Sequence, residues 1–253
     1  MKAGKYSIKE LFHNRDVEQV IIPEIQRDYV WGEKQVNGLL NSICDDYHEF
    51  NKGVKLVALP CEEDEIRLSF EQFYKKQKFS CNIGFIYAYN DPEYAGKYFL
   101  IDGQQRLTTI YLILLALAAE HSSLRARFEK MYLLADLPVI DFRVREASHQ
   151  FLKELVKVYI NGGVDIKDQS WYYNDYEHDQ TINSIICNLE FIKRKLVEKQ
   201  LINDDFISYL EDYVQFWYFD TGISEQGEFK LFIVAKSRRY ASGQWGKVVR
   251  ICQ

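Results

Sequence analysis

One segment of the chain has a strongly constrained local structure: a short apolar strand that passes through a glycine turn into an apolar helix. Residues 98–101 read Tyr-Phe-Leu-Ile, the Asp102–Arg106 turn reads Asp-Gly-Gln-Gln-Arg, and the apolar run Leu107–Ala119 follows. A strand, a tight turn and a helix start present free backbone N–H groups and the positive end of the helix dipole to an anion. Arg106 adds a planar, permanently charged group that suits phosphate. The segment therefore predicts a site for a phosphate-bearing ligand.

The same turn has a purely structural interpretation, in which Asp102 caps the helix and Gln104, Gln105 and Arg106 are solvated residues of its first turn. Against this interpretation, an arginine in the first turn opposes the helix dipole, and the three side chains concentrate hydrogen-bond donors at one point. Asp102 is also a candidate ligand for Mg²⁺, directly or through water. Mg²⁺ usually takes one or two carboxylates together with phosphate oxygens.

The segment Pro23–Trp31, which follows an expected strand at residues 20–22, is the second candidate site. Gln26 is suited to orient a water molecule or the edge of a base, and Arg27 is suited to bind phosphate. The alternative is a loop in which Tyr29 and Trp31 close the core while Gln26 and Arg27 face water. The functional interpretation gains support if this segment lies beside the Asp102–Arg106 turn.

Composition and charge exclude several classes of protein. With 253 residues, 47% of them hydrophobic and only four prolines, the chain is expected to be globular rather than disordered. Its net charge of −5 means that the surface as a whole does not attract nucleic acid. A DNA contact would need a local basic patch, for which the short runs Arg143–Arg145 and Lys236–Arg239 are the candidates.

The cysteines and the apolar segments predict a cytoplasmic protein. The five cysteines are scattered and lack a Cys-x-x-Cys pair, which is typical of a reduced protein without a zinc site. The first residues contain no apolar signal core, and the run Leu107–Ala119 is too short to cross a bilayer. The five histidines show no metal-ligand spacing and no obvious carboxylate partner, so surface or capping roles are expected for all of them: His13, His48, His121, His149 and His178.

Residue patterns predict an α/β unit, a helical region and returning strands. Ser7 and Glu10 form a capping-box pattern, and two aromatic and β-branched runs predict an antiparallel pair of strands. Helices are expected over residues 7–13, 33–50, 104–119, 122–135, 146–160, 179–200 and 204–210, and strands over 20–22, 79–89, 97–101, 213–219 and 229–234. The expected units are a core at 1–120, a helical region at 121–211, returning strands at 212–234 and an atypical tail at 235–253.

Two motifs, in this order, resemble the N-terminal domain of GmrSD-type restriction enzymes. The first is Ile22–Trp31, Ile-Pro-Glu-Ile-Gln-Arg-Asp-Tyr-Val-Trp, and the second is Ile101–Thr109, Ile-Asp-Gly-Gln-Gln-Arg-Leu-Thr-Thr. A third stretch, Trp217–Asp220 with the turn to Gly227, resembles the aromatic strand and turn that follow the helical region of that family. The similarity extends over about residues 6–235.

The resemblance implies an α+β fold: a ParB/sulfiredoxin-like α/β core with an appended helical region and a returning strand pair. In this family the Asp-Gly-Gln-Gln-Arg loop binds a nucleoside triphosphate and helps to hydrolyse it. Members serve bacterial defence against phage by recognising modified foreign DNA. The domain is often joined to a C-terminal His-Asn-His nuclease half.

Site residues follow from the resemblance, position by position. Gln26, Asp102 and Arg106 are expected to be catalytic, with Asp102 as the Mg²⁺ ligand. The residues expected to bind the nucleotide are Arg27, Gly103, Gln104, Gln105, Arg106 and Thr108. We expect phosphates to be held by the backbone around Gly103 and by Arg106.

The C-terminus departs from the family pattern. After Phe232–Val234 an Asn-Ser-Arg-Gly-like turn is expected, but Ala235–Gln253 follows instead. We interpret this stretch as a truncation or a change of reading frame that removes the nuclease half, and such a tail is expected to be poorly ordered. The rival hypothesis is a non-catalytic nucleotide- or DNA-binding regulatory module. A nuclease within this chain ranks last, because no His-Asn-His or Asp/Glu-x-Lys constellation is apparent.

Overall fold

The structure, a computed structural model, describes residues 3–12, 17–23, 28–57, 80–90, 94–142, 146–161 and 165–221. Several sequence-based predictions lie outside these residues: Gln26, Arg27, the basic runs at 143–145 and 236–239, the strand at 229–234 and the tail at 235–253.

A mixed sheet of six strands forms the base of the molecule, in the order β1-β8-β3-β4-β2-β7. Its strands are β1 (Gly4–Ser7), β2 (Gln19–Ile21), β3 (Cys81–Asn90), β4 (Lys97–Asp102), β7 (Ile140–Asp141) and β8 (Val214–Asp220). The expected antiparallel pairing of β3 with β4 is confirmed. Strands β4, β2 and β7 run parallel to one another, so their carboxyl ends lie toward the same edge of the sheet.

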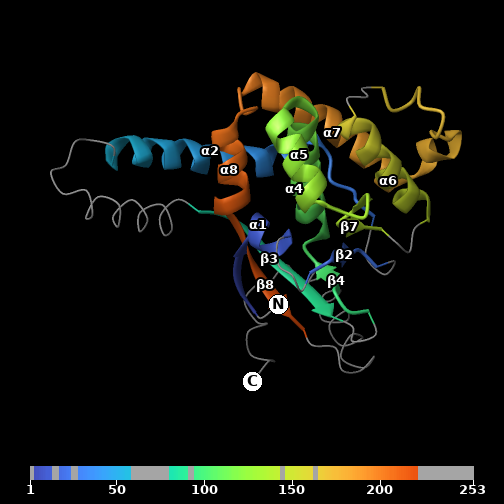
Figure 1. The fold of residues 1–253 in the computed structure, drawn as a ribbon, viewed down its shortest axis with the longest axis horizontal. Helices are drawn as coiled ribbons and strands as arrows, with labels where there is room; N and C mark the ends of the chain where they lie inside the picture. Colours follow the sequence, from blue (N-terminus) through green and yellow to red (C-terminus); the bar gives the residue numbers. More distant parts are fainter. Residues whose placement is uncertain are drawn as a thin grey trace.

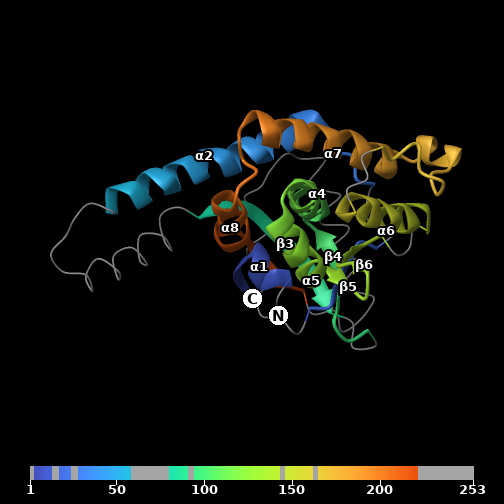
Figure 2. The ribbon, with the colours of Figure 1, turned by 45° about the horizontal axis from the view of Figure 1, so that its top comes forward.

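Helices gather on one side of this sheet (Figure 1). They are α1 (Ile8–Phe12), α2 (Glu33–Val57), α4 (Gln104–Glu120), α5 (Ser122–Met131), α6 (Glu146–Ile160), α7 (Gln180–Glu198) and α8 (Asp204–Tyr213), with a 3₁₀ helix at Asn174–His178. Figure 2 shows α4 in the middle of this layer, and α4 packs against α5, α6 and α7. The observed combination of helices with a mixed sheet confirms the expected α+β class.

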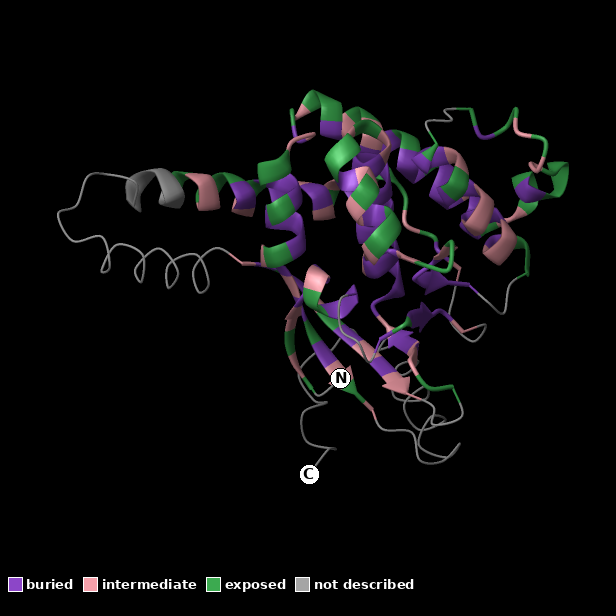
Figure 3. Cartoon of the chain, in the orientation of Figure 1, coloured by how far each residue is buried: buried purple, intermediate pink, exposed green. Residues whose placement is uncertain are grey.

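Apolar sequence explains the central place of α4. All residues from Leu107 to Ala118 are buried, so the helix has no polar face to present to water. Beneath it, Tyr98 and Leu100 of β4 join the same hydrophobic core. In Figure 3 the buried residues concentrate where α4 and the strands meet. The start of α4 is therefore held firmly by the core on which it rests.

Local signals fixed several helix starts. In the predicted capping box, the Ser7 backbone N–H donates to Glu10 Oε2 at 2.7 Å, and the Glu10 N–H donates to Ser7 Oγ at 3.1 Å. Asp179 caps α7 through the Ile182 N–H at 2.9 Å, and Asn203 caps α8 through the Phe206 N–H at 2.8 Å. Each bond satisfies a backbone donor that the helix itself leaves without a partner.

The helix expected over 122–135 is confirmed for residues 122–131 and wrong for the last four residues. It ends at Met131, and a small hairpin follows, formed by β5 (Leu133–Leu134) and β6 (Leu137–Pro138). Ala135 and Asp136 have positive φ angles of 48° and 64°, which a helix does not permit and a tight hairpin turn requires. The short strand β7 after this hairpin was also not predicted.

The returning strand lies one residue later than expected, because Tyr213 is the last residue of α8 and β8 is Val214–Asp220. β8 pairs antiparallel with β1 and parallel with β3, so it occupies the place between them. A segment near the end of the described chain thus completes the sheet of the N-terminal core. The proposed division of the chain into units stays a prediction.

Candidate functional site

The predicted turn joins the carboxyl end of β4 to α4 through Gly103. Gly103 has a φ of 99°, a backbone conformation that residues with a side chain rarely adopt. A Cβ at this position would lie 3.0 Å from Ile86 Cγ1 and 3.1 Å from the Phe85 carbonyl oxygen. Only glycine therefore lets the turn pass this close to β3. The close approach brings the start of α4 directly over the middle of the sheet.

Among the described residues no side chain caps α4, so the purely structural interpretation of the turn, in which Asp102 caps the helix, is wrong. The N-cap position is Gly103, whose carbonyl oxygen accepts the Leu107 N–H at 3.0 Å. Asp102 Oδ1 instead accepts the Gly103 N–H at 2.9 Å. The first backbone N–H groups of a helix have no partner within the helix, and they carry the positive end of its dipole. The turn thus keeps the features that suit an anion.

Arg106 lies over a bare stretch of β3. Its Nη2 donates to the Phe85 carbonyl oxygen at 2.8 Å. A Cβ on Gly84, which has a φ of 99°, would lie 2.3 Å from Arg106 Nη1, so the guanidinium occupies the space that any side chain there would fill. The arginine is partly exposed, and within the described residues its guanidinium makes no other hydrogen bond. Most of its donors remain available to a ligand.

Gln104 and Thr108 lie one turn apart on α4, and both are buried, with 3% and 2% of their surface exposed. Gln104 is therefore not the solvated residue of the structural interpretation. Thr108 Oγ1 has no hydrogen-bond partner among the described residues. Unsatisfied buried polar groups are unusual in proteins, and they often mark a functional position.

Gln105 is buried as well, and both polar atoms of its side chain form hydrogen bonds within the protein. Gln105 Oε1 accepts the Val30 N–H at 3.0 Å and the Trp31 N–H at 3.1 Å. Its Nε2 donates to the Asp28 carbonyl oxygen at 2.7 Å. The side chain thus fixes the end of the first motif to the first turn of α4. The described end of the first motif, residues 28–31, thus lies beside the Asp102–Arg106 turn.

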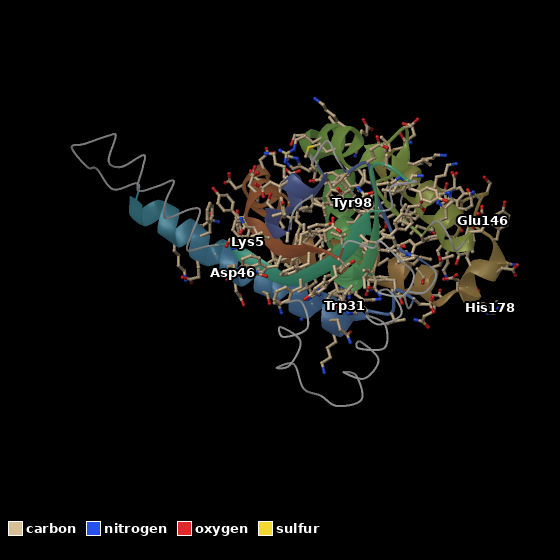
Figure 4. The ribbon with its side chains drawn as sticks, turned by 90° about the horizontal axis from the view of Figure 1, so that it is seen from below. Lys5, Trp31, Asp46, Tyr98, Glu146 and His178 are labelled. Carbon is tan, nitrogen blue, oxygen red and sulfur yellow. The ribbon has the colours of Figure 1, made fainter. Side chains whose placement is uncertain are left out.

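Tyr29 completes this contact from the core, since only 1% of its surface is exposed. Its hydroxyl lies 2.8 Å from Thr109 Oγ1 and accepts Asn188 Nδ2 at 3.0 Å. Burial raises the pKa of Tyr29 to about 12, against a smaller lowering by its bonds to Thr109 and Asn188. Trp31 also packs against the core and lies just before α2 (Figure 4). For these two aromatic side chains, the expectation that they close the core is confirmed.

Asp102 remains the candidate Mg²⁺ ligand. It is partly exposed and lies at the end of β4, directly before the uncapped start of α4. Among the described residues no group of three or more His, Cys, Asp or Glu side chains gathers into a metal site. One carboxylate fits a Mg²⁺ ion that takes its other ligands from phosphate and water. The residues present therefore suit an ion that arrives with a nucleotide.

Sequence reasoning missed one polar pair at the same edge of the sheet. His149 Nδ1 lies 2.5 Å from Asp141 Oδ1, so the expectation that no histidine has a carboxylate partner is wrong. Asp141 ends β7 and is 5% exposed, while Gln19 Nε2 donates to its other oxygen at 3.4 Å. His149 lies eight residues away on α6, the helix that follows β7.

The fold and these contacts can be compared with known proteins. Residues 8–240 match the family described as GmrSD restriction endonuclease, N-terminal domain. The chain belongs to this family. No curated protein matches the sequence. Membership of the GmrSD N-terminal family indicates a role in a restriction system.

Family membership agrees with the two motifs on which the resemblance rested, since both lie within the matched residues. In the described chain, none of the helices combines the length and the apolar character that a membrane crossing requires.

Proposed function

We propose that this GmrSD-family domain binds a nucleoside triphosphate at the Asp102–Arg106 turn and hydrolyses it as the sensor of a phage-restriction system. The observation that carries the proposal is the placement of Arg106. Its guanidinium is held at one point by the Phe85 carbonyl oxygen, lies over Gly84, and stands beside the uncapped start of α4. A fixed cation next to free backbone N–H groups is an arrangement that suits phosphate.

In this proposal the backbone N–H groups of Gln104 and Gln105 and the Arg106 guanidinium hold the phosphates, while the Gly103 N–H stays bound to Asp102. Gln105 contributes its backbone rather than its side chain, because the amide is already bound to the first motif. Thr108 supports the turn from the core side, one helical turn below Gln104. A Mg²⁺ ion held by Asp102 would neutralise phosphate charge.

Gln26 would orient the attacking water, and Arg27 would bind phosphate, since the contact of Gln105 with Asp28 places the end of their segment at the turn. Hydrolysis would then depend on positioning and on electrostatic stabilisation of charge at the transferred phosphoryl group. No covalent intermediate is required.

The wider role follows from family resemblance and is part of the same proposal. The domain would act in the cytoplasm, respond to modified foreign DNA and regulate a nuclease domain or subunit. A net charge of −5 limits direct DNA binding to a local basic patch.

A regulatory module that binds nucleotide without turnover is the second candidate. Asp102 is the only acidic residue of the turn, and one of its oxygens already accepts the Gly103 N–H. The turn therefore supplies anion-binding groups more clearly than a proton acceptor. In this version the bound nucleotide itself is the signal.

Phosphate release from GTP, ATP and CTP with Mg²⁺, with and without modified DNA, separates the two candidates. The enzyme releases phosphate, whereas the module shows only a rise in melting temperature with one of these nucleotides. In either case Arg106→Ala should weaken binding by roughly 10–100-fold, because a charged hydrogen-bond donor contributes about 1.5–3 kcal/mol. Circular dichroism should show an unchanged fold.

Arg194→Ala is the matched control, since Arg194 is exposed and pairs with Glu33 at 3.5 Å on the surface. Its nucleotide affinity should equal that of the wild type. A folded Arg106→Ala variant that retains full affinity would contradict the proposed site.

A further inference from the structure

The segment Asp28–Trp31, called the 28–31 segment below, lies between α4 and α7. On one side it is bound by Gln105 of α4, which contacts the backbone of Asp28, Val30 and Trp31. On the other side it is bound by two buried polar residues of α7, Thr181 and Asn188, which are both 0% exposed. The helical region and the predicted nucleotide turn therefore touch the same four residues.

Asn188 uses both of its amide hydrogens on this segment. Its Nδ2 donates to the Trp31 carbonyl oxygen at 2.6 Å and to the Tyr29 hydroxyl at 3.0 Å. The Tyr29 hydroxyl lies in turn 2.8 Å from Thr109 Oγ1, and Thr109 donates to the Gln105 carbonyl oxygen at 2.8 Å. A continuous chain of buried hydrogen bonds thus links α7 to the first turn of α4.

The acceptor atom of Asn188, Oδ1, shows that this residue is bound to the segment through its donors. Asn188 Oδ1 is buried and has no hydrogen-bond partner among the described residues. Leaving a buried acceptor unsatisfied is unfavourable, so the amide is suited to this place by its two donors alone. Neither leucine nor aspartate, which have a similar shape, can donate to Tyr29 and Trp31.

Thr181 binds the N-terminal end of the segment, at Asp28 and Tyr29. Its Oγ1 accepts the Tyr29 N–H at 3.2 Å and lies 3.4 Å from Asp28 Oδ1, to which it donates. Asp28 directly follows Arg27 in the chain. A shift of α7 by one helical turn would therefore move Asp28, which is the neighbour of the predicted phosphate-binding residue Arg27.

We infer that Thr181 and Asn188 are positioning residues, through which α7 holds the 28–31 segment against the turn and sets the nucleotide affinity of the site. The inference rests on the proposed function for the identity of the ligand. Coupling of this kind is reciprocal: if α7 sets the affinity for nucleotide, a bound nucleotide must favour the α7 position that holds the segment. The position of α7 would then depend on whether nucleotide occupies the turn, and a partner bound to the helical region would respond to that position.

Two variants remove the α7 contacts without changing shape greatly: Thr181→Val and Asn188→Leu. The first measurement, on ligand-free protein, is amide hydrogen exchange at Val30 and Trp31, whose N–H groups donate to Gln105 Oε1. Both should exchange at least roughly tenfold faster than in the wild type, since a loosened segment opens more often. The second measurement is the dissociation constant for GTP, ATP and CTP with Mg²⁺, at a temperature where each variant is fully folded. We expect it to rise by roughly tenfold.

Thr181→Ser restores the hydroxyl and should return both readouts to wild-type values. Glu190→Gln is the matched control, because Glu190 lies on the exposed face of the same helix. It should change neither exchange nor affinity.

Faster exchange with unchanged affinity would overturn the inference, since Thr181 and Asn188 would then be structural residues only. Unchanged exchange in both variants would overturn it as well. If the wild type binds none of the three nucleotides, the proposed function fails. The exchange rates then decide, independently of it, whether α7 holds the segment.

Discussion

The two sides of the first turn of α4 are built in opposite ways. Toward the helices, Gln105 has every polar atom of its side chain bound to the 28–31 segment. Toward the sheet, Arg106 makes a single hydrogen bond to Phe85 within the described residues and remains partly exposed. Two consecutive residues of one motif thus differ: the Gln105 side chain is bound inside the protein, whereas the Arg106 side chain is partly exposed at its surface.

The difference teaches that a shared motif does not imply a shared role. Gln105 acts on the protein, since its amide oxygen accepts two backbone N–H groups of the 28–31 segment and its Nε2 donates to the Asp28 carbonyl oxygen. Arg106 is prepared for a ligand, because an arginine held by one backbone oxygen keeps its other donors and its charge available. Substitutions on the two sides should therefore affect different measurements.

The largest effect is expected from Gln105→Ala, on stability. The Val30 and Trp31 N–H groups would lose their common acceptor, and the free energy of unfolding should fall by about 3 kcal/mol. Urea denaturation followed by circular dichroism measures the change. The control is Gln35→Ala, since Gln35 is exposed and accepts the Gly32 N–H at 3.3 Å. An unfolding free energy as low for the control as for Gln105→Ala would remove the contrast.

A smaller effect is expected from Gly84→Ala, on both stability and affinity. The new Cβ would lie 2.3 Å from Arg106 Nη1, at a residue whose φ is 99°. The strain should cost about 2 kcal/mol of unfolding free energy, and displacement of the guanidinium should weaken nucleotide binding by roughly tenfold.

Gly38→Ala provides the matched control, because nothing lies within 4 Å of its added Cβ. Gly38 lies in α2, where alanine is the better helix former, so this variant should gain up to about 1 kcal/mol. A Gly84→Ala variant with wild-type affinity would show that Arg106 does not need its place over β3.

The smallest effect concerns the closed side at high pH. The pKa of Tyr29 is raised to about 12 in the folded protein by burial, from the ordinary tyrosine pKa of 10.0. Folding thus favours the protonated hydroxyl, and this stabilisation is complete below pH 10 and declines as the pH rises toward 12. Between pH 10 and 11 the Tyr29 contribution should fall by about 1 kcal/mol.

Tyr29→Phe should show a decline that is smaller by this amount, as measured by urea denaturation at the two pH values. Other buried tyrosines are present in both proteins, so their titration cancels in the comparison. Equal declines would mean that Tyr29 titrates in the folded protein as it does in the unfolded one.

Sequence was sufficient where a signal is local. The capping box of Ser7 and Glu10, the pairing of β3 with β4 and the apolar helix after Gly103 all depend on residues close together in the chain. The hairpin at 133–138 was missed because each of its strands has two residues, too few for an alternating pattern. The added length of α2, which ends at Val57, was missed because the apolar spacing that predicted the helix ends at Tyr47 and Gly53 follows.

The site was predicted less completely for the same reason. Arg106 stands out because a cation at a helix start is unusual, but nothing in the sequence shows that the side chain of its neighbour Gln105 is bound inside the protein. The partners of the first motif, Thr181 and Asn188, lie about 150 residues away on a helix with ordinary apolar spacing. The pair Asp141 and His149 likewise depends on how the chain turns after β6. Such contacts require the fold itself.

The pairing of β8 has a consequence for synthesis of the protein on the ribosome. Strand β8 lies between β1 and β3, so residues made first and residues made near the end of the described chain share one set of backbone hydrogen bonds. Until residue 220 has emerged, β1 lacks its partner, and one edge of β3 remains exposed as a template for other chains. A nascent chain that stalls before this point should therefore recruit chaperones or aggregate. The sheet of the described residues is therefore complete only when β8 has left the ribosome.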